Sequence, residues 1–415
     1  MKKSKYLHYF LSVFLLFTAI PAFAQDDKGK IGFGKIKLIP GITIEEVYDD
    51  NIYKGNGTNN MAELEETDWI TRLTPSLLLN YPFTEEGSVS LGYQGVFSFY
   101  QDNDDNDWDE NNIIFGLDYK APGGFVLFIE DRHKDTEDPY GTDNDYKTGL
   151  PKTERWNNTL TTKAGYIFSN KLKAFTYCNY YKQDYDLDVD YSQDYDSYEL
   201  GAGAEIKIFP KTWGFVRYHF GERDYFTHPV GTGSNDSNDS DFDWHRVNMG
   251  MTWDSRAKLS GELNFGYNWK AYDNAFDING TRYEDKDTWI ASTFVSFTAT
   301  ENTSLSLSIS RALREVGSDT NEYFEDTVVG ITLQQIFRRK YVLTAGASYG
   351  KNDYNIPINR QREDDNYKAN IGVDYIIKEW LTAGVNYSYD KKDSNYVIND
   401  YTDNQFMLFL SMIYQ

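Results

Sequence analysis

The stretch Lys258–Tyr272 reads KLSGELNFGYNWKAY, and apolar and polar residues alternate along it. One set of alternate positions is mainly apolar and includes Leu259, Leu263, Phe265, Tyr267 and Trp269. The other set is polar and includes Ser260, Glu262, Asn264, Asn268 and Lys270. Successive side chains of a β-strand point to opposite faces, so the stretch predicts a strand with one apolar wall and one polar wall.

The same alternation recurs from about residue 35 to the last residue, from a first strand near Lys37–Tyr48 to a last strand over Asn404–Gln415. Short connections such as Ala121–Gly124 alternate with long acidic ones such as Gln101–Asn112 and Lys134–Thr153. Membrane barrels place tight turns at the periplasmic rim and long loops outside the cell. We therefore predict an all-β fold, a transmembrane antiparallel β-barrel with about 18 strands, within a range of roughly 16–18.

The N-terminus has the pattern of a secretory signal peptide. Lys2, Lys3 and Lys5 precede the apolar run Tyr9–Ile20, and Ala22-Phe23-Ala24 forms a small-x-small cleavage site. The apolar run is short for a membrane-spanning anchor, which favours cleavage over retention. We predict that residues 1–24 are removed and that residues 25–415 form one barrel domain in the outer membrane of a Gram-negative bacterium.

Composition agrees with this location. Aromatic residues make up 17% of the chain, which suits two interfacial girdles, and a single cysteine, Cys178, excludes an intramolecular disulfide. By parity, Trp69, Trp156, Trp269 and Trp289 belong to the outer girdle. The net charge of −23 argues against binding to nucleic acid, which requires a basic surface.

The final strand resembles the C-terminal signal by which outer-membrane barrels are recognised. Its outward positions are Phe406, Leu408, Leu410, Met412 and Tyr414. We expect the outer-membrane assembly machinery, the lipid and lipopolysaccharide to be partners of this chain.

Acidic residues are concentrated in the predicted loops. Gln101–Asn112 reads QDNDDNDWDENN and contains six carboxylates without a basic residue. The candidate divalent-cation ligands in this loop are Asp102, Asp104, Asp105, Asp107 and Asp109. Oxygen ligands suit calcium or a cation that bridges lipopolysaccharide phosphates, but the loop lacks the glycine of an EF-hand. The alternative is an ordinary solvated loop, and the sequence leaves the metal undetermined.

The positions that parity assigns to the lumen carry more basic than acidic residues. The selectivity candidates are Arg72, Arg132, Arg155, Lys163, Arg217, Arg223, Arg246, Lys270 and Arg314, with Lys207 and Lys368 on the same face. The predicted inward acids are Asp118, Glu130, Glu199, Glu205, Glu262, Asp374 and Asp390. Rings of Arg and Lys favour anions in a pore. The alternative is that these charges form cross-strand ion pairs that brace the wall.

No catalytic motif is present: the chain lacks HExxH, paired cysteines, a phosphate-binding glycine loop and a nucleophile elbow. We therefore predict a protein that is not an enzyme and needs no cofactor.

Two early segments carry a family resemblance. Pro40–Tyr53 reads PGITIEEVYDDNIY and Ile70–Tyr81 reads ITRLTPSLLLNY. Both resemble the β-barrel porin family, type two, whose members are outer-membrane barrels often encoded beside exopolysaccharide or capsule assembly genes. The resemblance implies an export role and periplasmic polysaccharide-export components as partners.

Two functions fit these features. The first is an outer-membrane porin-like channel, a passive conduit for an exported polysaccharide or another anionic solute. The second is a structural or surface-interaction barrel with an occluded lumen, whose acidic loops bind partners or divalent cations.

Overall fold

The computed structural model describes residues 31–57, 65–138, 153–186, 193–226, 240–254, 257–276, 282–315, 323–355 and 361–414. The predicted signal peptide and large parts of the predicted long loops lie outside the described residues. Within the described ranges, no helix is long and apolar enough to cross a membrane.

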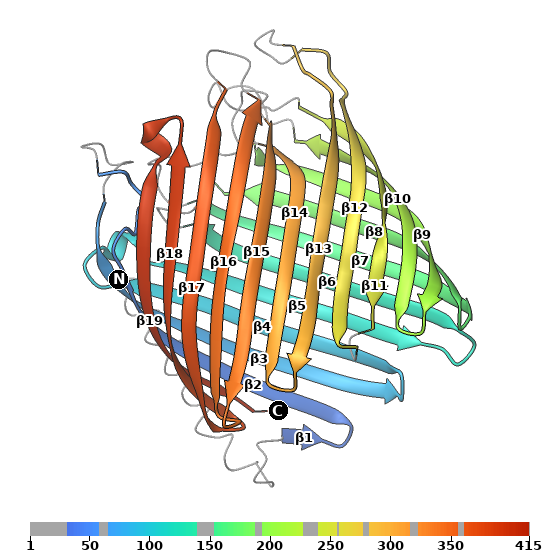
Figure 1. Cartoon of the computed structure of the whole chain (residues 1–415), viewed down its shortest axis with the longest axis horizontal. Helices are drawn as coiled ribbons and strands as arrows, with labels where there is room; N and C mark the ends of the chain where they lie inside the picture. The colour runs from blue at the N-terminus through green and yellow to red at the C-terminus, as the bar shows by residue number, and fades with distance from the viewer. Residues whose placement is uncertain are drawn as a thin grey trace.

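Eighteen strands, β2 to β19, form a closed antiparallel barrel in which each strand pairs with its neighbours in sequence and β19 pairs with β2 (Figure 1). The strands are β2 Ile36–Asp49, β3 Asp68–Thr84, β4 Gly87–Tyr100, β5 Trp108–Lys120, β6 Phe125–Asp138, β7 Thr153–Ser169, β8 Leu172–Tyr185, β9 Tyr195–Phe209, β10 Thr212–Tyr225, β11 Phe242–Trp253, β12 Leu259–Tyr272, β13 Lys286–Thr300, β14 Thr303–Glu315, β15 Tyr323–Phe337, β16 Tyr341–Asn355, β17 Glu363–Lys378, β18 Leu381–Ser394 and β19 Tyr401–Ile413. The predicted fold class is confirmed. An extra short strand, β1 (Ile31–Phe33), was not predicted and pairs with the start of β2.

The strands are longer than the sequence pattern predicted. They contain 12 to 17 residues, whereas about 9–11 residues cross a bilayer. The predicted loops Gln101–Asn112 and Lys134–Thr153 are therefore wrong at their boundaries, because β5 begins at Trp108 and β6 continues to Asp138. Acidic residues do not end a strand whose backbone partners continue, and Glu110 still pairs with Thr136 across the ladder.

Alternation along β12 separates the two faces as predicted. Phe265, Tyr267 and Trp269 are 39%, 41% and 41% exposed, as expected for side chains that face lipid. Asn268 and Lys270, at the alternate positions, are 9% and 3% exposed. The apolar outer wall and the polar inner wall of this strand match the arrangement of an outer-membrane barrel.

The turn after β2 folds over the inner wall at the loop end of the barrel. The Asn51 side chain donates to the carbonyls of Gly55 and Thr402 at 2.9 Å each and accepts from the Gly55 amide at 3.0 Å. Beneath this turn lies a small apolar cluster of Val47, Ile52, Ile70 and Tyr100. We call residues 50–57 the mouth turn. It occupies part of the barrel mouth next to the first and last strands.

The barrel wall is not fully paired between β13 and β14. Their ladder ends at the pair Ala291–Arg311, although β13 continues outward to pair with β12 and β14 continues outward to pair with β15. Residues 286–290 and 312–315 thus have no partners across this boundary, and the two strands diverge toward their loop ends (Figure 1). We call this unpaired stretch the β13–β14 split.

Candidate functional site

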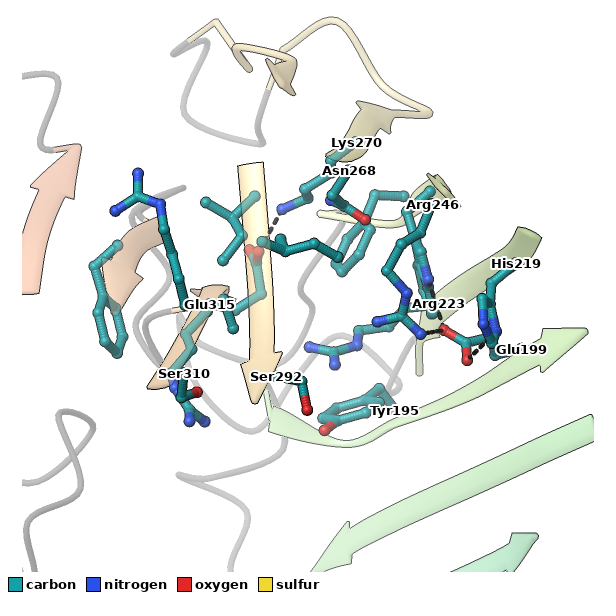
Figure 2. Close-up of a pocket in the computed structure, with 18 of the residues that line it drawn as sticks. Tyr195, Glu199, His219, Arg223, Arg246, Asn268, Lys270, Ser292, Ser310 and Glu315 are labelled. Atoms are coloured by element: carbon teal, nitrogen blue, oxygen red, sulfur yellow. Dashed lines mark hydrogen bonds and ion pairs between the residues drawn. The ribbon is translucent and has the colours of Figure 1, made fainter. Parts of the chain in front are cut away.

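A cavity of about 970 Å³ lies inside the barrel toward its loop end, lined by β7 to β15 (Figure 2). Seven basic side chains and two carboxylates line it: Arg155, Arg217, Arg223, Arg246, Lys270, Arg311 and Arg314, with Glu199 and Glu315. Aromatic side chains, among them Tyr195, Tyr225, Phe242 and Trp244, complete the wall. Basic side chains outnumber carboxylates in the lining, and four further carboxylates, Glu205, Glu262, Glu325 and Asp326, pair with three of its arginines.

Arg217 on β10 is held by two carboxylates, Glu205 of the adjacent β9 and Glu262 of β12, two strands away. Its two terminal nitrogens donate to the Glu262 carboxylate at 2.8 and 2.9 Å, and Glu205 lies 3.7 Å away. The guanidinium also stacks 3.8 Å from the Phe215 ring centre. This fork-like geometry orients Arg217 rigidly, as expected for a bidentate pair.

Glu199 on β9 is the centre of a second group of contacts (Figure 2). Arg246 donates to its Oε2 at 2.5 Å and the Trp244 indole donates to the same atom at 3.1 Å. Nδ1 of His219 lies 3.0 Å from Oε1, but it is not aligned for a hydrogen bond. Glu199 therefore orients side chains from β10 and β11 along one side of the cavity.

Lys270 on β12 lies almost fully buried at the edge of the β13–β14 split. Its ammonium lies 3.9 Å from the centres of both the Phe242 and Tyr272 rings. It pairs with Glu315 of β14 and donates to the Tyr272 hydroxyl at 2.7 Å. The pair joins β12 to β14 across the loop end of β13 (Figure 2).

Two of the nine selectivity candidates lack an acidic partner among the described residues. Among the described residues, Arg223 and Lys163 have no carboxylate within 4.0 Å. Arg223 lies 4.1 Å from the Tyr195 ring centre, and Lys163 lies 3.9 Å from that of Phe175. Contacts with aromatic faces offset part of the desolvation of these cations without cancelling their charge.

The remaining predicted lumen bases have the inward parity that the sequence indicated. Four of them pair with a carboxylate: Arg72 with Glu45 at 3.3 Å, Arg132 with Glu130 at 3.2 Å, Arg314 with Asp326 at 2.6 Å and Lys368 with Asp390 at 3.2 Å. Arg155 contacts the Tyr185 hydroxyl at 3.4 Å, and Lys207 lies over the Trp213 ring. Six of the nine selectivity candidates are thus ion-paired. A residue that stabilises the barrel wall through an ion pair can also influence which ions pass. The role of these residues in ion selectivity stays a prediction.

The predicted cation loop forms a short turn. Asp68 accepts hydrogen bonds from the amides of Asp102 and Asn103, and Asp107 accepts one from Tyr100 at 2.7 Å. Asp104 and Asp105 lie exposed on a single 3-10 turn, and Asp109 contacts Asn111. The structure does not gather these five carboxylates at one point, so their role in cation binding stays a prediction.

Sequence analysis missed Arg311 on β14, because its parity is that of the lipid-facing Leu307. Its Nε donates to the Trp289 carbonyl at 3.2 Å, its Nη1 to Thr327 at 2.7 Å and its Nη2 to Glu325 at 2.7 Å. The guanidinium thus lies in the wall at the β13–β14 split and supplies a donor where the backbone ladder has ended. A charged residue within the otherwise apolar positions of the run SLSLSISRAL was the available signal.

Residues 193–413, which begin just before β9 and run through β19, match the family described as Putative beta-barrel porin 2. The chain belongs to this family. Barrels of the porin family are generally transport proteins without enzymatic activity. No curated protein sequence matches the chain.

Among solved structures, this porin-family chain is similar to OpdO of Pseudomonas aeruginosa, with 11% identity, coverage of 92% of this chain and 98% of that one, and a TM-score of 0.47. It is also similar to OpdK of the same organism, crystallised with vanillate, with 10% identity, coverage of 91% and 98%, and a TM-score of 0.45. The siderophore receptor PirA of P. aeruginosa has 11% identity, coverage of 90% and 80%, and a TM-score of 0.40.

Proposed function

We propose that this porin-family barrel is a passive conduit for anionic solutes, and that its substrate class is an exported acidic polysaccharide. The observation that supports the proposal is the cavity lining, in which seven basic side chains face two carboxylates. Although the chain has a net charge of −23, this part of its inner wall is rich in arginine and lysine, and Arg223 has no carboxylate partner within 4.0 Å among the described residues. Basic rings of this kind favour anions over cations.

The cavity also has features that suit an extended sugar chain. Tyr195, Tyr225 and Trp244 offer aromatic faces, and Asn248 and Asn268 offer amide groups beside the basic side chains. Aromatic rings cover apolar sugar faces, while polar groups on the same wall fix orientation. No step in this mechanism requires a cofactor or an energy source: the solute diffuses along a polar wall whose charges set its preference.

We expect the mature barrel, residues 25–415, to conduct ions in a planar bilayer and to prefer anions. The reversal potential under a KCl gradient measures this preference, and addition of an acidic oligosaccharide should block the current more strongly than a neutral oligosaccharide of equal length. A correctly folded barrel that conducts no current would contradict the proposal and favour a surface-interaction barrel with an occluded lumen. Cation preference would contradict the role of the basic lining.

A further inference from the structure

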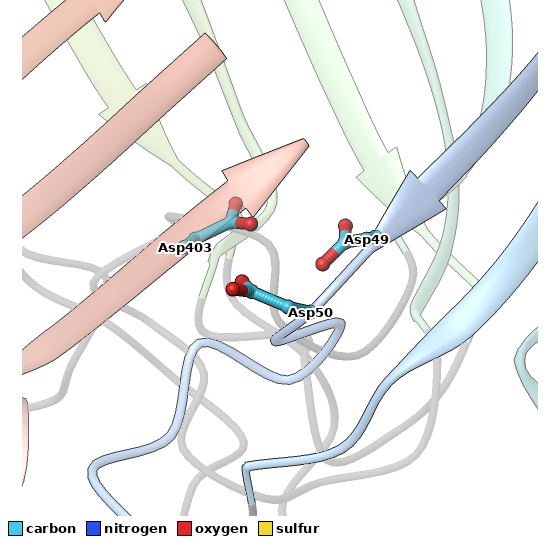
Figure 3. A group of neighbouring side chains, drawn as sticks. All are labelled: Asp49, Asp50 and Asp403. Atoms are coloured by element: carbon cyan, nitrogen blue, oxygen red, sulfur yellow. The ribbon is translucent and has the colours of Figure 1, made fainter. Parts of the chain in front are cut away.

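We propose that Asp49, Asp50 and Asp403 bind a divalent cation, calcium by the chemistry of its ligands, where the last strand of the barrel closes onto the first. Asp49 ends β2, Asp50 begins the mouth turn, and Asp403 lies near the start of β19. One carboxylate oxygen from each residue lies within 4.8 Å of the others, and the three side chains point toward one another (Figure 3).

Burial distinguishes this group from the acidic loops. Asp49 is 6% exposed and Asp403 is 3% exposed. The Oδ1 atom of Asp403 is buried without a hydrogen-bond partner, on a side chain that points into the group. An acceptor left in this state costs free energy unless something binds it.

Neutral donors orient the three carboxylates. The Asn404 amide and side chain donate to Asp50 at 2.6 and 2.8 Å. The Gln405 side chain donates at 3.0 Å to both Asp49 and Asp403. These bonds fix the oxygens in place but supply no positive charge.

No described lysine or arginine forms an ion pair with the group. None has a nitrogen within 4.0 Å of these carboxylates, and Lys54, on the same turn, instead pairs with Asp390 at 3.5 Å. Three carboxylates this close repel one another strongly at low dielectric. A bound dication offsets most of the repulsion and also gives the free Asp403 oxygen a partner.

The ligand set favours calcium. All three side chains offer carboxylate oxygen, which hard cations prefer over the nitrogen and sulfur ligands of zinc or copper. Calcium also tolerates irregular geometry and completes its shell with water, whereas magnesium demands a near-ideal octahedron. A site of this type at the loop end of the barrel would bind calcium with a dissociation constant of about 0.1–1 mM, as extracellular calcium modules do.

The site would tie together segments that are far apart in the sequence. The β2–β19 ladder ends at the pair Asp49–Gln405, and the cation would extend this closure beyond the last ladder pair. It would also hold the mouth turn, whose Asn51 side chain already bonds to Thr402. The site is separate from the predicted ligands of the Asp102–Asp109 turn.

The test compares the thermal unfolding of the mature wild-type barrel with that of Asp403→Asn, each in 1 mM CaCl₂ and in EDTA. We expect calcium to raise the melting temperature of the wild type by several degrees more than that of the variant. In EDTA the variant should be as stable as the wild type or more stable, because it removes one of three like charges. The double variant Asp104→Asn/Asp105→Asn, which removes two exposed carboxylates, should respond to calcium as the wild type does.

Terbium luminescence provides a second readout on the folded proteins. The wild type should bind one Tb³⁺ that calcium displaces. The double variant Asp49→Asn/Asp403→Asn should not bind this ion. An equal response of wild type and Asp403→Asn to calcium would overturn the proposal and assign the effect to the loops. The proposal would also be overturned if the wild type and Asp403→Asn had equal stability both in calcium and in EDTA. The Asp403 carboxyl group would then be protonated and would not bind a cation.

Discussion

Replacing Arg217, Arg223 and Arg246 together with glutamine is expected to lower the anion preference of the channel several-fold. All three side chains line the cavity, and the change leaves Glu199 and Glu262 without their arginine partners. A unit charge acts on an ion ~4 Å away with about 1 kcal/mol even in water, so three lost charges outweigh thermal energy. The reversal potential under a salt gradient measures the shift.

Two comparisons separate selectivity from bracing. Glu262→Gln and Arg217→Gln disrupt the same ion pair. If the pair is purely structural, both variants should lose the same stability, and they should not shift ion selectivity in opposite directions. If the charges set selectivity, Glu262→Gln should raise anion preference while Arg217→Gln lowers it. Both effects should shrink at high salt, since the Debye length falls from about 10 Å at 0.1 M to about 3 Å at 1 M.

A matched control removes three charges at the opposite rim. Lys120, Lys340 and Lys378 lie at the short turns, and their replacement with glutamine removes the same charge without touching the cavity. The role of the basic lining would be contradicted if the triple arginine variant kept the anion-to-cation permeability ratio of the wild type. It would also be contradicted if the triple lysine variant changed that ratio by the same amount.

The second large effect is expected at the β13–β14 split. Arg311→Met should lower the free energy of unfolding by about 3 kcal/mol, because the largely buried Glu325 carboxylate loses its closest cation and keeps only Lys286, 3.5 Å away. Arg311 and Glu325 side chains are only 13% and 18% exposed. The variant also loses the donor to the Trp289 carbonyl. Urea unfolding of the barrel in lipid vesicles measures the loss.

Two further variants test the cause of that loss. Arg132→Met removes a pair whose side chains are 43% and 37% exposed, and its cost should stay below about 1 kcal/mol. Adding Glu325→Gln to Arg311→Met should recover part of the stability, since the buried charge then disappears. Hydrogen exchange should accelerate at residues 286–290 in Arg311→Met alone. Equal losses in Arg311→Met and Arg132→Met would show that the split does not depend on Arg311.

Apart from Arg311, alternation along the strands predicted which basic residues line the cavity, but not what these residues contact. Parity placed Arg217, Glu262 and Lys270 on the lumen side. Their partners depend on strand register and twist: Arg217 reaches Glu262 two strands away, and Lys270 reaches Glu315 across the end of β13. A diagonal contact of this kind has no signature in the spacing along the chain.

The sequence by itself determined the barrel, the alternation of its faces and the approximate number of strands, because a period of two residues is imposed locally by the geometry of an extended chain. Only the tertiary structure decided where the ladder stops and which charges meet. Asp49 and Asp403 are neighbours because the barrel closes β19 onto β2. Arg311 lies within the wall because the backbone partners of β13 and β14 end at Ala291. Both outcomes depend on backbone hydrogen bonds between distant segments, which no local pattern specifies.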